Sequence, residues 1–122
     1  MECTLKKYNN GFSHPLDTYP DIQTAIAAAK ALHDPAWPVW QGLNVIGRVG
    51  NTIACLFDTR EEGRYYVLGA ASDNTPASYI SGPWPRNKAE YLQQVHAKDY
   101  TCCWIALGQI DDSGEICFRT DF

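Results

Sequence analysis

The chain has 122 residues, of which 45% are hydrophobic and 20% are charged, and its formal net charge is −4. A chain of this size and composition forms one folded domain with its own core, which excludes a disordered protein. The acidic balance and the lack of any basic run argue against a nucleic-acid-binding protein, because such proteins carry a basic surplus that neutralises phosphates.

The first part of the chain predicts a strand and then a helix. Residues 2–8 alternate weakly between polar and apolar and predict a strand at a sheet edge, with a turn and loop after it. The helix has Thr18 as its predicted N-cap, and it ends at residues 33–35 because the residue before Pro35 avoids the helical region. Apolar residues recur along one face of this helix, at Ile22, Ala25, Ile26, Ala29 and Leu32.

The rest of the chain predicts mainly strands. Apolar or alternating runs occur at residues 37–40, 43–49, 52–58 and 64–71. The pair Gly50-Asn51 suits a two-residue hairpin turn. Residues 72–86 show no period and predict the longest irregular segment, and a surface helix with Asn87 as its N-cap follows. A hairpin closes the chain, at residues 100–110 and 115–120.

The predicted element order is therefore β-α-β-β-β-α-β-β. Short connections between consecutive strands favour antiparallel neighbours. We predict a single α+β domain over residues 1–122, built as an antiparallel meander of about five strands with two helices on one face. The other sheet face would carry aromatic residues and cysteines, and a homodimer is one way to bury it.

The cysteines give little support for chemistry. Their odd number, five, fits no disulfide framework, and residues 1–8 have no apolar segment of the signal-peptide type, so we expect a cytoplasmic protein with reduced thiols. No apolar run approaches the roughly 20 residues that span a bilayer, so no membrane association is expected. Cys102 and Cys103 are adjacent, and in a strand they would point to opposite faces and could not chelate one ion together. No metal site or other cofactor is therefore predicted.

A cysteine nucleophile is the one catalytic arrangement that the sequence offers. His96 lies close in sequence to Cys102 and Cys103, and Asp99 is available to orient its imidazole. Such a nucleophile needs a base within hydrogen-bond reach and a lowered pKa. No local signature of a cysteine enzyme surrounds these thiols, so buried and inert cysteines are favoured.

The irregular segment 72–86 is the strongest candidate for a binding surface. It contains Tyr79, Trp84 and Arg86, three residue types that are enriched at the energetic centres of protein interfaces. Pro83 and Pro85 flank the tryptophan and are expected to hold it outward as a stiff contact point. The alternative is that Trp84 packs back over the sheet, and the same two interpretations apply to Trp37 and Trp40.

These observations favour a small non-enzymatic binding protein that acts stoichiometrically on a protein partner. Its size, mild acidity and aromatic-rich strands are typical of inhibitor, immunity or accessory proteins, including those carried by phages and other mobile elements, although no motif is shared. The alternative is a small-molecule-binding domain or a Cys/His-dependent enzyme. Its pocket would lie between the sheet and the helices and would be lined by Trp40, Tyr66 and Trp104.

Overall fold

The structure is a computed structural model and describes residues 1–60 and 62–121. Two helices occur in it, α1 (Ile22–Leu32) and α2 (Arg86–His96). The strands, in chain order, are β1 (Cys3–Asn9), β2 (Phe12–Tyr19), β3 (Gln41–Val49), β4 (Thr52–Asp58), β5 (Tyr65–Ala70), β6 (Tyr79–Trp84), β7 (Cys102–Ile110) and β8 (Ile116–Arg119). The α+β class predicted from the sequence is confirmed.

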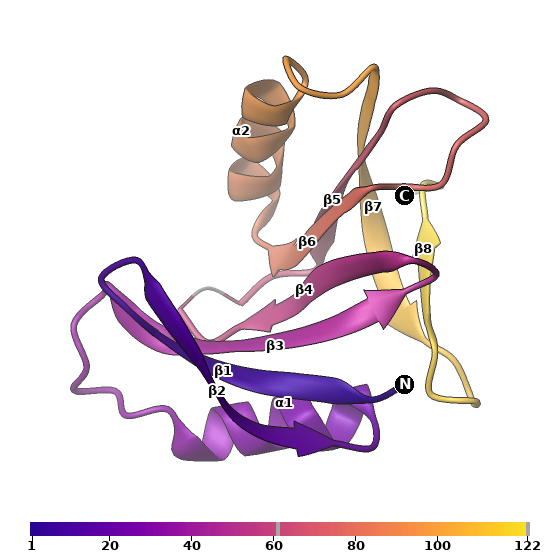
Figure 1. Cartoon of the computed structure of the whole chain (residues 1–122). Coiled ribbons are helices and arrows are strands. Elements are labelled where there is room, and N and C mark those ends of the chain that lie inside the picture. Colours follow the sequence, from indigo (N-terminus) through magenta and orange to yellow (C-terminus); the bar gives the residue numbers. More distant parts are fainter. Residues whose placement is uncertain (61, 122) are drawn as a thin grey trace.

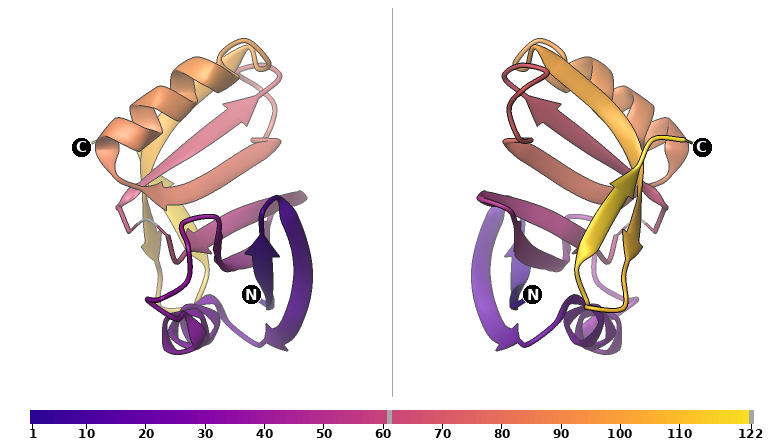
Figure 2. Two further views of the ribbon diagram at one scale, coloured as in Figure 1. Left: turned by 90° about the vertical axis from the view of Figure 1, so that its left-hand side faces the viewer. Right: turned by 90° about the vertical axis from the view of Figure 1, so that its right-hand side faces the viewer.

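The described strands form one curled, mixed sheet of eight strands in the order β2-β1-β3-β4-β6-β5-β7-β8. All neighbours are antiparallel except β4 and β6, which run parallel and meet at the single pair Cys55 and Ser81. This seam divides the sheet into two halves, β1–β4 and β5–β8, and each half is continuous in sequence. Figures 1 and 2 show the two halves turned relative to each other, which gives the sheet its curl.

The two helices cover opposite faces of this sheet. In β5, Tyr66 and Leu68 belong to the main core, which also contains Ile22 of α1. Val67 lies between them in sequence and packs instead in a second cluster with Ala89 of α2. Because successive strand residues point to opposite faces, α1 and α2 lie on different sides of the sheet. The prediction that both helices share one face is therefore wrong.

The first helix forms close to where its apolar pattern predicts. Its N-cap is Asp21, whose carboxylate accepts a hydrogen bond from the Thr24 N–H at 2.7 Å. Thr18, the predicted N-cap, lies in β2 instead. The inward-facing residues of the stripe are buried, at Ile22, Ala25 and Ala29, whereas Leu32 at the helix end is 54% exposed.

The predicted five-stranded antiparallel meander is wrong, because the sheet is mixed and contains two strands that the sequence analysis assigned to loops. β2 is exposed along nearly its whole length and contains Pro15, so it has neither an apolar pattern nor a full set of N–H donors. β6 contains Gly82 and Pro83, which are joined by a cis peptide bond. With β2 present, β1 is an inner strand and not the predicted edge.

Other boundaries differ from the prediction by smaller amounts. The strand at residues 52–58 and the closing hairpin are confirmed, but residues 37–40 form turns before β3 and not a strand. α2 begins directly after Pro85, so Asn87 lies inside the helix and is not its N-cap. Neither described helix has the length and apolar character needed to cross a bilayer.

Candidate functional site

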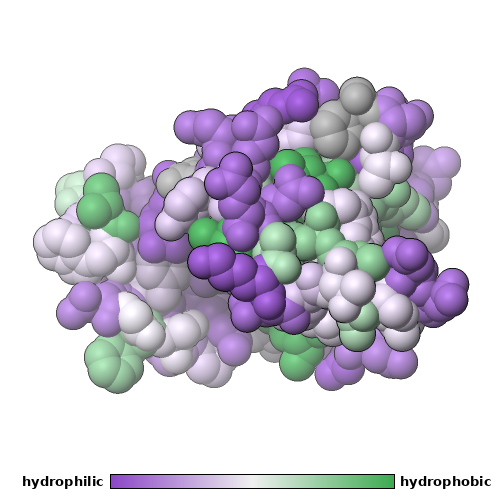
Figure 3. Space-filling model, turned by 90° about the horizontal axis from the view of Figure 1, so that it is seen from above, coloured by the Kyte–Doolittle hydropathy of each residue, from purple (hydrophilic) through white to green (hydrophobic). Residues whose placement is uncertain are grey.

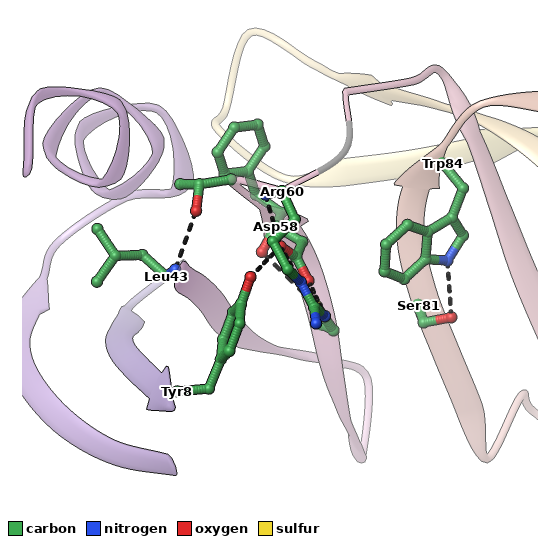
Figure 4. A network of polar contacts seen from close by, with 9 residues as sticks. Tyr8, Leu43, Asp58, Arg60, Ser81 and Trp84 are labelled. Atoms are coloured by element: carbon green, nitrogen blue, oxygen red, sulfur yellow. Dashed lines mark hydrogen bonds and ion pairs between the residues drawn. The ribbon is translucent and has the colours of Figure 1, made fainter. Parts of the chain in front are cut away.

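A buried carboxylate organises the end of β4. The Asp58 side chain is 2% exposed and accepts hydrogen bonds from Tyr8 Oη at 2.9 Å and from the Arg60 N–H at 2.8 Å. The Arg60 guanidinium approaches the same carboxylate through Nη2 at 2.8 Å and Nε at 3.3 Å, and it lies 4.2 Å from the centre of the Tyr8 ring. Figure 4 shows the phenol and the guanidinium converging on this carboxylate. Burial, and then the negative charge of Asp58, raise the pKa of the Tyr8 phenol.

This network fixes the direction of Arg60. A buried carboxylate is costly unless it is paired and hydrogen bonded, so the guanidinium has a strong reason to stay against it. The Arg60 side chain is nevertheless 41% exposed. One part of the guanidinium therefore neutralises Asp58, while the remainder reaches the surface at the end of β4.

The segment 33–40 lies beside this arginine and is held by backbone hydrogen bonds. Trp37 N donates to Asp34 O at 2.9 Å, and Gln41 N donates to Pro38 O at 3.0 Å. A third bond, from Asn10 N to Trp40 O at 3.0 Å, ties the segment to the β1–β2 turn. The chain path here is therefore defined by its own hydrogen bonds, although it forms no strand or helix.

A cleft of about 320 Å³ opens between this segment, the end of β4 and the start of α2. Its apolar lining is Trp37, Pro38, Val39 and Trp84. Its polar lining is His33, Gln41, Thr59, Arg60 and Lys88. We call this hollow the cationic cleft, because the described residues that line it include three basic side chains and no carboxylate.

Cations lie close to the indoles of this region. Lys7 Nζ lies 4.7 Å from the centre of the Trp37 ring, and Lys88 Nζ lies 5.7 Å from the centre of the Trp84 ring. The His33 ring meets Trp37 edge to face at 5.2 Å. Contacts of this kind hold cationic and aromatic side chains together at one surface. The described lining of the cleft therefore combines apolar side chains with basic ones.

Two large apolar side chains stand exposed on the segment 33–40, one of them in the lining of the cleft and the other next to it in sequence. Val39 is 82% exposed and Trp40 is 55% exposed. The β1–β2 turn is bonded to this segment through Asn10 N and Trp40 O and lies at the same end of the molecule (Figure 1). Phe12, which follows this turn, is 79% exposed. Figure 3 shows green apolar atoms at this left-hand end, away from the mostly purple side chains over α2. We call Val39 and Trp40 the apolar rim.

The structure brings Tyr79 and Trp84 together but turns both inward. Trp84 is only 9% exposed, so the expectation that it stands outward is wrong. Its indole Nε1–H donates to Ser81 Oγ at 3.1 Å, and Tyr79 Oη lies 2.8 Å from the same hydroxyl (Figure 4 draws the Trp84 bond). Arg86 lies at the start of α2 and binds Glu90 at 3.1 Å. The part of Trp84 that remains accessible lines the cationic cleft.

The His96 and cysteine candidates are not arranged as a catalytic group. His96 Nδ1 lies 4.0 Å from Asp99 Oδ2, and its ring stacks against Tyr79 with the ring centres 4.3 Å apart. In the described part of the chain no hydrogen bond joins His96 to Cys102 or Cys103. A hydrogen bond to Asp73 raises the pKa of the Cys102 thiol, and burial raises the pKa of the Cys103 thiol. Both shifts oppose the thiolate form that a nucleophile needs.

The three residues of the predicted alternative pocket do not line one hollow. Trp40 lies before β3, between Val39 and Gln41, which line the cationic cleft. Tyr66 is 5% exposed, and its hydroxyl donates to Leu56 O at 2.9 Å across the seam. Trp104 lines a separate open hollow of about 410 Å³ together with Phe118. Among the described residues, no group of three or more His, Cys, Asp or Glu side chains is placed to hold a metal ion.

The sequence analysis missed the polar part of the cleft. Arg60 and Lys88 come from two segments that the chain brings together only through the β4–β6 seam, so no local spacing marks them. Asp58 and Tyr8 are 50 positions apart. The sequence feature that could have indicated the cleft is the apolar run from Trp37 to Trp40. This run is rich in aromatic residues and contains a proline, which is typical of a surface loop.

Comparisons with protein-family models, with curated proteins and with solved structures gave no match for this chain. Its function is therefore inferred from the geometry of the described residues.

Proposed function

We propose that this chain is a non-enzymatic binding protein that acts stoichiometrically on a protein partner. The partner would dock on the cationic cleft and on the apolar rim beside it. The observation that carries the proposal is the exposure of Val39 and Trp40 on a segment held by its own hydrogen bonds. Exposed apolar side chains on a defined backbone present contact area at little entropic cost, which is a property of interface hot spots.

The chemistry of the partner follows from the exposed side chains of this segment. Val39 and Trp40 are both large, apolar and exposed. Burial of such side chains supplies most of the binding energy at the centre of an interface. The docking segment of the partner is therefore expected to carry at least one large apolar side chain. Inhibitor, immunity and accessory roles all use stoichiometric binding of this kind, and they belong to this proposal.

The absence of an activated nucleophile among the described thiols favours binding over catalysis. Burial raises the pKa of Cys55 to about 11, and the pKa values of Cys102 and Cys103 are also raised. At neutral pH these thiols stay protonated. A second candidate function, the binding of a small molecule, is supported by the volume of the cleft, which lies at the low end of the range for ligand pockets.

The test begins with a partner captured from the native host and then purified. The double variant Val39→Asp, Trp40→Ala should bind this partner at least about 30-fold more weakly, the loss expected for removing one interface hot spot. Ile53→Asp is the matched control, because Ile53 is 67% exposed but lies at the start of β4, at the other end of the β3–β4 hairpin. Titration calorimetry gives both the affinity and the stoichiometry. Equal losses in the double variant and the control, or no loss in either, would contradict the proposed surface.

A further inference from the structure

The last two strands leave part of one sheet edge open. β8 pairs with β7 only from Leu107 to Ile110, whereas β7 begins at Cys102. The right-hand view of Figure 2 shows β8 beside only the later part of β7. On its other side, β7 pairs with β5 from Cys102 to Leu107. Among the described strands, the stretch from Cys102 to Ala106 therefore has a neighbour on one side only.

The hydrogen bonds of the closing hairpin indicate which backbone groups of β7 face this edge. Asp111 N donates to Glu115 O at 2.9 Å, so the backbone groups of Asp111 point toward the β8 side. In an antiparallel strand both backbone groups of a residue point to one side, and the side alternates along the strand. The backbone groups of Ile105 and Cys103 therefore point to the same side as those of Asp111, beyond the end of β8.

Two contacts around Cys103 support this direction. Gly69, the β5 residue opposite Cys103, accepts the Ser78 N–H at 2.8 Å and so turns its carbonyl away from β7. The Cys103 carbonyl accepts a hydrogen bond from Gln93 Nε2 of α2 at 2.9 Å. In the part of the chain that the structure describes, no hydrogen bond reaches the Cys103 N–H or either backbone group of Ile105. This edge therefore offers two N–H donors and one carbonyl acceptor to a further strand.

An apolar hollow lies beside the open stretch. Trp104 packs against the main core, whereas its neighbours Cys103 and Ile105 pack in the second cluster, on the α2 face. Trp104 lines the hollow of about 410 Å³ together with Phe118 and Thr120, at the end of β8 and directly after it. None of the described residues that line this hollow is charged. In an added strand, the side chain opposite Trp104 would stand on the same face as the indole, over this hollow.

A second copy of this chain fits the edge poorly. If two β7 strands paired antiparallel about Ile105, Cys103 of one copy would face Leu107 of the other. Leu107 is already paired with Arg119 of β8. Such a dimer would gain only the bonds between the two Ile105 residues. A short extended segment from another protein avoids this conflict and uses all of the open groups.

We propose that the open edge of β7 accepts an extended segment of a protein partner as an added antiparallel strand. The first residue of the segment exchanges two hydrogen bonds with Ile105, and the second, which is large and apolar, stands opposite Trp104 and enters the hollow. The third accepts the Cys103 N–H. Because Gln93 holds the Cys103 carbonyl, this third residue needs no N–H and can be proline. The inference goes beyond the proposed function, since it uses neither the cationic cleft nor the apolar rim.

The probe is the blocked peptide N-acetyl-Val-Phe-Pro-Thr-amide, titrated into nitrogen-15-labelled protein. Its Kd should lie in the millimolar range, as expected for a few hydrogen bonds and one buried ring. Before the peptide is added, the Ile105 amide should exchange with solvent faster than the Trp104 amide, which faces β5. The peptide should then slow the exchange of Ile105 and shift the Trp104 indole signal.

Two changes in the peptide test the mode of binding without altering the protein. A methyl group on the valine nitrogen removes the donor to the Ile105 carbonyl and should weaken binding at least about tenfold. The same methyl group on the phenylalanine nitrogen is the control and should leave the Kd unchanged, because that nitrogen points away from β7. Replacing the phenylalanine by alanine empties the hollow and should also cost at least about tenfold.

Gln93→Ala tests the register of the added strand. This variant frees the Cys103 carbonyl, so a third residue that has an N–H gains an acceptor. The ratio of the Kd values of the proline peptide and of N-acetyl-Val-Phe-Thr-Thr-amide should shift at least about threefold toward the threonine peptide. Gln94→Ala removes an exposed side chain of the same helix and should leave this ratio unchanged.

Equal effects of the two methyl groups, an unchanged ratio in Gln93→Ala, or no response of Ile105 to the peptide would each overturn the proposal. Slow exchange of the Ile105 amide without peptide would also overturn it, and if the protection grows with protein concentration, the occupant is a second copy. The Val39→Asp, Trp40→Ala variant should bind the peptide with an unchanged Kd. Failure at this edge and failure of the proposed docking surface are therefore distinguishable.

Discussion

The hydrogen bond from Tyr8 to Asp58 offers a direct measure of how strongly the buried carboxylate is stabilised. Tyr8→Phe removes one donor from a charged acceptor that is 2% exposed, and the contacts from Arg60 remain. Hydrogen bonds to charged groups contribute about 1.5–3 kcal/mol, and neutral ones about 0.5–1.5 kcal/mol. We expect Tyr8→Phe to lower the free energy of unfolding by about 2 kcal/mol.

Tyr66→Phe is the matched control for this measurement. Tyr66 is also nearly buried, and its hydroxyl donates over the same 2.9 Å, but to the neutral carbonyl of Leu56. The control should therefore cost about 1 kcal/mol. Urea unfolding at pH 7, followed by tryptophan fluorescence, compares the two variants at equal m-values. If Tyr8→Phe costs no more than Tyr66→Phe, the bond to Asp58 is no stronger than a bond to a neutral acceptor, and the reasoning about the position of Arg60 fails with it.

The remaining predictions concern pH and two glycines. Burial raises the folded-state pKa values of Tyr8 and Tyr66, so both phenols keep their protons after the unfolded chain begins to lose them near pH 10. The raised thiol pKa values already lower the free energy of unfolding above about pH 9, and each phenol should add a further fall of about 1.4 kcal/mol per pH unit above about pH 10. Each Phe variant should remove the contribution of one phenol to this fall. Gly42→Ala places a Cβ against Tyr8 Oη, so it should destabilise the protein by about 1–3 kcal/mol and cost less in the Tyr8→Phe background, as a double-mutant cycle would show. Gly63→Ala places a Cβ against the Trp84 backbone, which cannot move aside, so it should both destabilise the protein and change the Trp84 indole N–H signal.

Each of these predictions has a clear contrary result. An equal fall above pH 10 in the original chain and in both Phe variants would mean that neither phenol is protected in the folded chain. Additive costs for Gly42→Ala and Tyr8→Phe would mean that the two sites do not touch. Gly114→Ala is the control for Gly63→Ala, because Gly114 has open space around it and only a positive φ of +81° to strain an alanine. Similar losses for both alanine variants would contradict the close approach at Gly63.

Elements with a strong local pattern were predictable from the sequence. α1 has its apolar residues at helical spacing. Successive side chains of β4 point to alternate faces of the sheet, and turn residues flank this strand at both ends. The β7–β8 hairpin is marked by a polar turn that contains Gly114. In these elements local propensity and burial favour the same structure, so a single sequence suffices.

The strands that were missed are stabilised by neighbours that no local pattern reveals. β2 is exposed on nearly every residue and forms because β1 offers it hydrogen-bond partners along its length. β6 contains Gly82 and Pro83, which resemble loop residues, yet its neighbours β4 and β5 bury most of it. The outward position expected for Trp84 failed for the same reason, since Ser81 and α2 enclose the indole. Tertiary contacts decided each of these cases.

The seam between β4 and β6 has a consequence for how the polypeptide can be divided. Everything from β1 to β4, with α1, precedes it, and everything from β5 to β8, with α2, follows it. A cut between Asp58 and Tyr65 would therefore yield two peptides with four strands and one helix each. When the two peptides meet, Tyr66 and Leu56 would again be joined, and folding would be completed across the junction. The chain is thus laid out for fragment complementation, in which recovery of the fold reports that two separately fused proteins have come together.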